Sequence, residues 1–283
     1  MLIEIIKFLF LSGLIVIISK YFLVKLLRKL GEVLNLKPNT IGNVAGIATS
    51  VPELLTISIS SLSGLADASI FNVLSSNIIN FIQYIASIKL NNNQKKIKNK
   101  GIMTDLILVV STIIIPIVLI FLNVEINIIL VPLFILLLFG FYYISGNAHK
   151  LYLNKEDKEM ADEIEKEKKW ERGNRRKATR YTIYLVVVAI LLFVVGNYLG
   201  DTLEALCNYF GVPQILIGII LGFVTSIPEL ITFFESQKHH NISGENNMVG
   251  VVEATNNLLT SNIMNLFVIQ SIGIVLYSIV TIF

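Results

Sequence analysis

A short polar segment occurs twice inside otherwise apolar sequence, first as Thr49-Ser50-Val51-Pro52-Glu53 and again as Thr225-Ser226-Ile227-Pro228-Glu229. Each copy puts a carboxylate, two hydroxyls and a helix-breaking proline into a stretch apolar enough to lie in a bilayer. Such groups cost stability there, so their repetition indicates a function. A second shared block follows each copy, Ser76-Asn77-Ile78-Ile79-Asn80 and Ser261-Asn262-Ile263-Met264-Asn265. The chain is a duplicated unit.

The composition places the chain among integral membrane proteins. Apolar residues make up 54% of it and charged residues 15%, and the mean hydropathy is +0.72. The apolar runs are long enough for helical spans and too continuous for the alternating pattern of barrel strands. We therefore predict an all-α polytopic membrane protein with about eight transmembrane helices. The expected spans are residues 2–24, 39–62, 66–88, 102–122, 126–145, 181–199, 212–235 and 248–277.

Basic residues fall on one side of these spans. Lys and Arg cluster after the first, third and fifth spans, whereas the connections 63–65, 123–125 and 200–211 contain neither. The positive-inside rule then places the N-terminus outside and the charged segment 149–180 in the cytoplasm. We expect the protein in the plasma membrane. In this orientation the Glu53 span runs outward and the Glu229 span runs inward, so the two repeats are inverted.

Three segments follow from this topology. Residues 1–148 form a first half with one repeat at 42–81, and residues 181–283 form a second half with the other repeat at 218–267. Between them, 149–180 is interpreted as a helical tether rich in Glu and Lys, in preference to a regulatory cation site. Inverted repeats with polar, proline-interrupted helices are typical of secondary transporters, whose sites lie near the membrane midplane.

The repeats supply the oxygen ligands that a hard cation needs. Calcium takes about six to eight oxygens from carboxylates, carbonyls, hydroxyls and water. Glu53 and Glu229 would balance a doubly charged ion, and Asn80 and Asn265 offer amide oxygens. The candidate hydroxyl ligands are Thr49, Ser50, Ser76, Thr225, Ser226 and Ser261. Spacings of three and four residues put each group on one helix face, and each proline weakens the helix one turn upstream. For the hydroxyls alone, helix packing is the simpler interpretation.

The doubled block resembles the α-repeats of the cation/calcium antiporter superfamily, and most closely those of sodium/calcium exchangers. The resemblance covers residues 42–81 and 218–267. It implies four cation sites, with Glu53 and Glu229 binding calcium or sodium alternately and the carbonyls of Gly46 and Gly222 as backbone ligands. It also implies alternating access, in which the first and sixth spans slide across the rest. No organic cofactor is expected.

The chain departs from the family pattern at several positions. Ala48, Val224, Ser75 and Thr260 stand where the family has glycine, and larger side chains there would tighten helix contacts. Asn265 stands where sodium/calcium exchangers often have aspartate. Two carboxylates and two amides leave less negative charge for several sodium ions, and this is compatible with proton coupling. Either Na⁺ or H⁺ is therefore the expected exchange ion.

The second half is short for this family, because few residues follow Asn265. We expect a compact variant whose exposed flank is covered by a second subunit, a homo-oligomer, with an incomplete chain as the alternative. His239 and His240 are interpreted as part of an elongated cytoplasmic loop, with metal binding or pH sensing as the alternative. Glu253 either lines an entrance or is a helix-end residue.

Two classes of function remain on the sequence alone. The first is a secondary active antiporter that moves Ca²⁺, or a similar divalent cation, against Na⁺ or H⁺. The second is a non-transporting membrane protein that keeps the cation site as a sensor or scaffold, and a passive channel is a weaker third. No nucleophile, base and orienter pattern is present, so we predict that the protein is not an enzyme. The expected partners are the lipid bilayer and inorganic cations, not nucleic acid.

Overall fold

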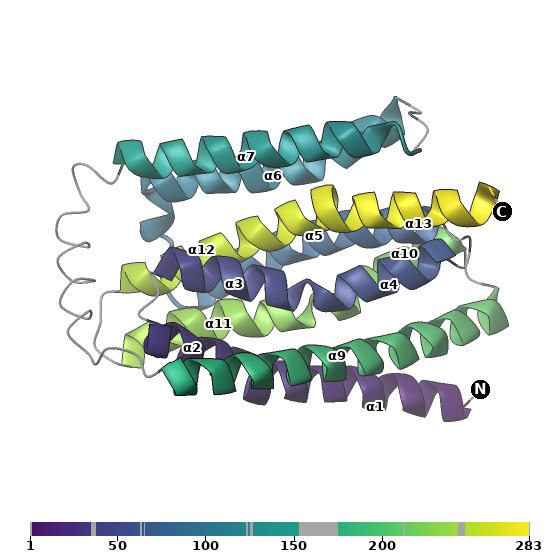
Figure 1. Cartoon of the computed structure of the whole chain (residues 1–283), viewed down its shortest axis with the longest axis horizontal. Coiled ribbons are helices and arrows are strands. Elements are labelled where there is room, and N and C mark those ends of the chain that lie inside the picture. The colour runs from purple at the N-terminus through teal and green to yellow at the C-terminus, as the bar shows by residue number, and fades with distance from the viewer. Residues whose placement is uncertain are drawn as a thin grey trace.

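The computed structural model describes residues 2–34, 38–62, 64, 66–122, 124, 127–152, 175–211, 213–242 and 247–282. Over these ranges the chain is all-helical (Figure 1). In chain order the elements are α1 Leu2–Ile18, η1 Ser19–Leu23, α2 Val24–Leu34, α3 Pro38–Thr49, α4 Val51–Leu62, α5 Ala66–Leu90, η2 Lys96–Lys98, α6 Lys100–Phe121, α7 Leu130–Tyr152, α9 Arg175–Phe210, α10 Gln214–Thr225, α11 Ile227–Ile242, α12 Asn247–Ile263, η3 Met264–Ile269 and α13 Gln270–Ile282.

Each repeat consists of a broken helix followed by a long helix. In Figure 1, α3 and α4 run from left to right, and α10 and α11 run from right to left. The following helices are reversed in the same way, since α5 runs leftward and α12 runs rightward. The prediction that the two repeats are inverted is therefore confirmed by the direction of the helices.

Both breaks fall at the serine of the repeated motif. Helix α3 ends at Thr49 and α4 begins at Val51, while α10 ends at Thr225 and α11 begins at Ile227. The proline is the second residue of each following helix, where its missing N–H is tolerated. At the same time its ring disfavours a continuous helix through the preceding turn. The motif thus interrupts a membrane helix at its middle.

The first helix of each repeat packs closely against the second helix of the other repeat. A Cβ at Gly46 of α3 would lie 2.7 Å from the Asn257 carbonyl oxygen of α12. A Cβ at Gly218 of α10 would lie 2.5 Å from the Ala68 carbonyl oxygen of α5. Gly42 and Gly222 make the equivalent contacts, so each helix carries a pair of glycines four residues apart. Small residues let membrane helices approach at this distance.

Two further layers cover this centre. Helices α1, α2 and α9 share an apolar cluster that includes Leu23 and Leu192 and reaches Ala45 and Val224 of the repeats. Helices α6 and α7 pack on the opposite side, where Phe134 and Phe141 of α7 meet Phe267 edge to face. In Figure 1 the two layers lie at the bottom and top of the view, with the repeats between them.

Several predicted boundaries differ from the observed helices. The connection expected at 200–211 is helical over most of its length, because α9 continues to Phe210, and Gly211, with φ of +62°, follows it. Helix α7 also extends beyond its predicted end, to Tyr152. The segment 153–174 of the predicted linker lies outside the described residues, as do the side chains of His239 and His240.

Six helical stretches in the described part of the chain are long and apolar enough to cross a membrane: Thr40–Leu62, Lys100–Phe121, Leu130–Asn147, Arg176–Thr202, Gly218–Lys238 and Met248–Thr281. Two of the expected spans, 2–24 and 66–88, are not among them. In α5 the polar residues Asn72, Asn77, Asn80 and Gln83 lower the hydropathy, and all four are buried between other helices. The total of about eight spans stays a prediction.

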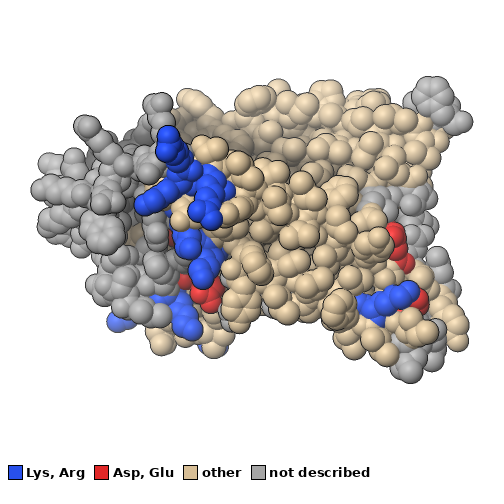
Figure 2. Space-filling view, turned by 60° about the horizontal axis from the view of Figure 1, so that its bottom comes forward, with Lys and Arg blue, Asp and Glu red and all other residues tan. Residues whose placement is uncertain are grey.

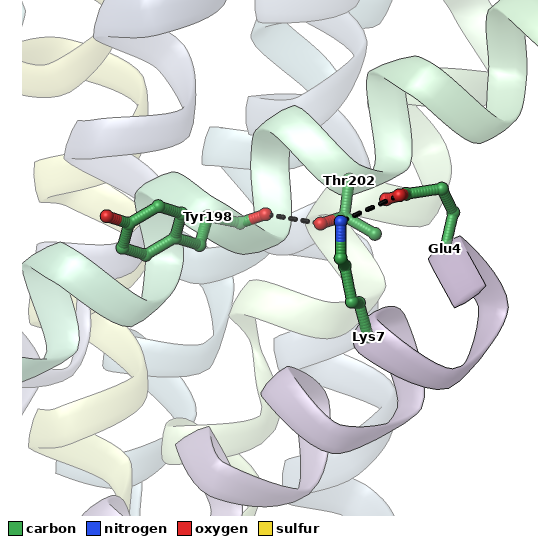
Figure 3. A network of polar contacts seen from close by, with 4 residues as sticks. All are labelled: Glu4, Lys7, Tyr198 and Thr202. Atoms are coloured by element: carbon green, nitrogen blue, oxygen red, sulfur yellow. Dashed lines mark hydrogen bonds and ion pairs between the residues drawn. The ribbon is translucent and has the colours of Figure 1, made fainter.

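On the face that Figure 2 shows, the described charged side chains lie at the two ends of the helix bundle, with an uncharged band between them. Figure 2 shows Lys and Arg gathered at one end, where α2, α5, α6 and α9 carry Lys25, Lys89, Lys100 and Arg176. At the other end Lys7 pairs with Glu4 at 2.7 Å. Figure 3 shows this pair on α1 next to the part of α9 where Thr202 donates to the Tyr198 carbonyl at 2.7 Å. We call the first of these the Lys-rich end.

Labelling of introduced cysteines tests the predicted orientation. In a Cys207→Ser background, Ile128→Cys should react with a membrane-impermeant maleimide in intact cells, because it is exposed at the end opposite to the Lys-rich end. Lys95→Cys, which is exposed at the Lys-rich end, should react only after permeabilisation. The reverse pattern would invert the topology.

Adding a methyl group tests the close helix approach. Gly218→Ala should lower the free energy of unfolding by about 1–3 kcal/mol, because the added Cβ meets backbone that cannot move freely. Gly140→Ala in α7 is the matched control, since nothing lies within 4 Å of a Cβ there. The measurement is unfolding of the detergent-solubilised protein, and equal effects of the two substitutions would argue against the close packing.

Candidate cation-binding site

The two motif glutamates lie at the start of the helices that follow the breaks. Glu53 is in the first turn of α4 and Glu229 in the first turn of α11, and both side chains are fully buried. The N-terminus of a helix favours negative charge, so each break provides a suitable place for a carboxylate. The two groups come from opposite repeats, and the Ser261 hydroxyl links Glu229 to Ser50, which is three residues before Glu53. The structure thus brings both predicted carboxylates to one place.

The centre of the molecule holds buried oxygen atoms that accept no hydrogen bond. These are Oε1 and Oε2 of Glu53, Oε2 of Glu229, and the amide oxygens of Asn80 and Asn265. Buried polar atoms are nearly always paired, so a group of unpaired ones needs an explanation. Every atom in this set is an acceptor. A cation is the ligand that satisfies several oxygen acceptors at once.

A serine of the second repeat connects the two halves of this site. Ser261 of α12 donates to Oε1 of Glu229 at 3.0 Å. The same hydroxyl lies 3.0 Å from the Ser50 hydroxyl and accepts from the Asn80 amide at 3.3 Å. Four predicted site residues therefore form one hydrogen-bonded group drawn from both repeats.

Two asparagines outside the predicted ligand set cross-link the repeats. The Asn77 amide donates to the Asn262 carbonyl at 3.2 Å, and the Asn262 amide donates to the Asn77 carbonyl at 3.2 Å. Their side-chain oxygens accept from the amides of Asn265 and Asn80, each at 3.3 Å. Because the NH₂ group of each predicted ligand is held in this way, its oxygen is left for another partner. Asn77 and Asn262 are positioning residues.

The remaining predicted hydroxyls bond to nearby backbone. Thr49 donates to the Ala45 carbonyl at 2.9 Å and Thr225 to the Leu221 carbonyl at 2.9 Å. Ser226 donates to the Gly222 carbonyl at 2.7 Å, and Ser76 donates to the same oxygen at 3.4 Å. All four side chains are buried.

The two glycine carbonyls predicted as backbone ligands already accept hydrogen bonds. Besides those at Gly222, the Gly46 carbonyl accepts from the Ser50 hydroxyl at 2.8 Å. Each also accepts from the backbone N–H four residues later, at 3.2 Å. A cation at either oxygen would therefore have to compete with these donors, and the assignment of Gly46 and Gly222 stays a prediction.

Two asparagines one turn away from the site were missed by sequence reasoning. The Asn72 amide donates to the Thr56 hydroxyl at 2.8 Å, and Asn257 makes the same bond to Thr232. Both pairs occupy corresponding positions in the two repeats, so a longer alignment of the repeats would have found them. One difference between the repeats is that Asn265 lies in the π-helical turn η3, whereas Asn80 lies in regular helix. Such turns frequently occur at functional sites.

The residues that replace family glycines lie in helix contacts. Ser75 donates to the Gly218 carbonyl at 3.3 Å, and Thr260 donates to the Asn43 side chain at 3.0 Å. Both join the first helix of one repeat to the second helix of the other. Ala48 and Val224 instead pack into the apolar cluster shared with α1 and α9. All four side chains therefore lie in helix contacts, and that they tighten these contacts stays a prediction.

Comparison with known proteins gives the family. The family model described as "Sodium/calcium exchanger protein" matches residues 5–146 and 180–282. A search among curated proteins finds no match. This chain belongs to the sodium/calcium exchanger family, whose members are membrane cation antiporters.

Solved structures of the sodium-calcium exchanger NCX_Mj have a similar fold. One, soaked with 100 mM Na⁺ and 10 mM Sr²⁺, superposes with a TM-score of 0.58 at 19% identity, covering 100% of this chain and 88% of that one. Another, soaked with 10 mM Na⁺ and zero Ca²⁺, gives a TM-score of 0.57 at 18% identity, covering 100% and 89%. The likeness confirms the transporter fold.

Removing one cross-linking asparagine tests how the repeats are held together. Asn77→Ala should lower the free energy of unfolding by about 1–3 kcal/mol, because it leaves buried groups on Asn262 and Asn265 without partners. Asn256→Ala is the control, since the Asn256 amide bonds within its own helix, to the Val252 carbonyl. An equal loss in both variants would argue against a special role for the cross-link.

Proposed function

We propose that this protein is a secondary active antiporter that exchanges Ca²⁺, or a similar divalent cation, for Na⁺ or H⁺ by alternating access. The observation that carries the proposal is the group of unpaired buried oxygens at the meeting point of the two repeats. Both repeats contribute to it, and every member is an acceptor. Family membership supports antiport of cations, and the unpaired oxygens support a cation site between the two repeats.

The charge of the site fits one divalent ion. Glu53 and Glu229 supply two carboxylates, which together balance a doubly charged cation in a buried place. Asn80 and Asn265 add neutral amide oxygens, and the hydroxyls of Ser50 and Ser261 lie beside them. Oxygen ligands of this kind suit calcium better than a transition metal, which favours nitrogen or sulfur.

The exchange ion is proposed to share these ligands. When the divalent ion leaves, the charges of the buried carboxylates Glu53 and Glu229 are no longer balanced, which is unfavourable. Either sodium ions or protons relieve that repulsion. The amide at Asn265 reduces the negative charge available for several sodium ions, and for this reason H⁺ is kept beside Na⁺ as a candidate.

Two features of the fold support alternating access. The helices are broken at Ser50 and Ser226, so the site lies where backbone can rearrange at small cost. In addition, the layer of α1, α2 and α9 meets the repeats through apolar side chains, including Ala45 and Val224. An apolar contact of this kind can slide without breaking directional bonds.

Ion flux into liposomes tests the proposal. The purified protein should take up radiolabelled Ca²⁺ when an outward Na⁺ gradient or an outward H⁺ gradient is imposed, and the effective gradient identifies the exchange ion. Glu53→Gln and Glu229→Gln should each abolish uptake, because each removes half of the charge that balances the ion.

Glu235→Gln is the matched control, since it removes a carboxylate from α11 outside the site and should leave uptake intact. Calcium binding that persists without gradient-driven flux would overturn the antiporter and leave a sensor or scaffold. Flux that follows the calcium gradient alone would indicate a channel.

A further inference from the structure

Three hydrogen bonds join α11 to α12 in a row that starts at the candidate site. Ser261 donates to Glu229 at 3.0 Å, Asn257 donates to Thr232, and Ser236 donates to Oε1 of Glu253 at 2.7 Å. We call this row the α11–α12 ladder. Its members on α12 recur every four residues and so share one helix face. Each step rises about 6 Å, which places Glu253 about 12 Å from Ser261 along the axis.

The ladder leads toward the Lys-rich end. Helix α12 begins at that end, and Glu253 is closer to its start than Asn257 or Ser261. Although Glu253 carries a carboxylate, its side chain is only 5% exposed. A buried carboxylate is costly in a membrane protein, so it is more often functional than structural.

The other repeat has no equivalent carboxylate. It does have the equivalent of the Asn257–Thr232 bond, since the Asn72 amide donates to the Thr56 hydroxyl at 2.8 Å. The residues that correspond to Ser236 and Glu253 are Ser60 and Ala68, and Ala68 is apolar and fully buried. Asp67 is adjacent, but its side chain is exposed. The inverted repeats therefore differ at this position, because Glu253 of α12 is a buried carboxylate and Ala68 of α5 is apolar.

An unpaired oxygen lies between Glu253 and the centre. The amide oxygen of Asn257, in the middle rung, is buried and accepts no hydrogen bond, while its NH₂ group is held by Thr232. Its residue is 0% exposed. The Asn257 oxygen is unpaired and lies one helical turn from the Glu253 carboxylate. Together they can provide oxygen ligands for a partly dehydrated cation.

We infer that Glu253 and Asn257 form a second cation subsite, through which a divalent cation passes between the central site and the Lys-rich end. The inference rests on the proposed function. The basic residues of the Lys-rich end, such as Lys25 and Lys89, disfavour the approach of a cation from that side. A carboxylate just inside them offsets this effect. The opposite end carries no comparable group of basic residues among the described side chains, so it needs no such subsite.

Sided transport measurements test this subsite. Inside-out and right-side-out vesicles from one expression host present opposite faces to the medium, so each reports the half-saturating Ca²⁺ concentration for its own face. Glu253→Gln keeps an acceptor for Ser236 but removes the charge. It should raise the half-saturating Ca²⁺ by about tenfold on the face with the Lys-rich end, because an ion that enters from that face loses a carboxylate ligand on its path. The value on the other face should change by less than about twofold.

Two variants serve as controls. Glu253→Asp keeps the charge and should shift the half-saturating Ca²⁺ much less than Glu253→Gln. Ser60→Ala changes the residue that corresponds to Ser236 in the other repeat and should leave both faces unchanged.

The possible outcomes separate this inference from the proposed function. Wild-type protein without gradient-driven flux in either vesicle orientation would overturn the antiporter and the subsite with it. Wild-type flux combined with a Glu253→Gln effect that is equal on both faces, a complete loss on both faces, or no effect would overturn the subsite alone. A rise in the half-saturating Ca²⁺ that Glu253→Gln causes only on the face with the Lys-rich end, and that Ser60→Ala does not cause, supports the subsite.

Discussion

The close approach of helices from opposite repeats is the constraint on which the rest of the structure depends. Helix α3 meets α12, and α10 meets α5, at glycines where a single methyl group would collide with backbone. Because the first helix of each repeat packs against the second helix of the other repeat, the site forms only when both repeats are present. This exchange is what brings Glu53 and Glu229, which lie far apart in sequence, into one buried group.

That buried group is under-satisfied in a specific way. Hydrogen-bond donors around it are used to hold other groups: Asn77 and Asn262 hold the amides of Asn265 and Asn80, and Ser261 serves Glu229. What remains is a set of oxygens without donors. In a buried site this arrangement is unfavourable, and the cost is the physical basis of the cation affinity that we propose. The second carboxylate position, Glu253, extends the same chemistry along α12 on one side only.

Symmetry between the repeats accounts for the shared contacts around the central site, and departures from this symmetry make the two membrane faces different. Thr56 with Asn72 and Thr232 with Asn257 are the same contact built twice. By contrast, Glu253 corresponds to Ala68, and the π-helical turn at Asn265 has no counterpart at Asn80. Two identical inverted repeats would give a cation the same surroundings from either face of the membrane. The differences at Glu253 and Asn265 therefore make the two faces unequal.

The sequence was enough to predict the membrane class, the duplication, the inversion and Glu53 and Glu229 as candidate ligands, because apolar content, repeated motifs and the distribution of Lys and Arg are local or additive properties. It did not determine that α9 continues through 200–210, since helix ends depend on packing as well as composition. Nor did it reveal the roles of Asn77 and Asn262, which were visible in the repeated block but had no assigned partner. These contacts are seen in the three-dimensional structure alone, because a bond between α5 and α12 depends on how closely two distant helices approach, and that distance is set by glycines elsewhere in the chain.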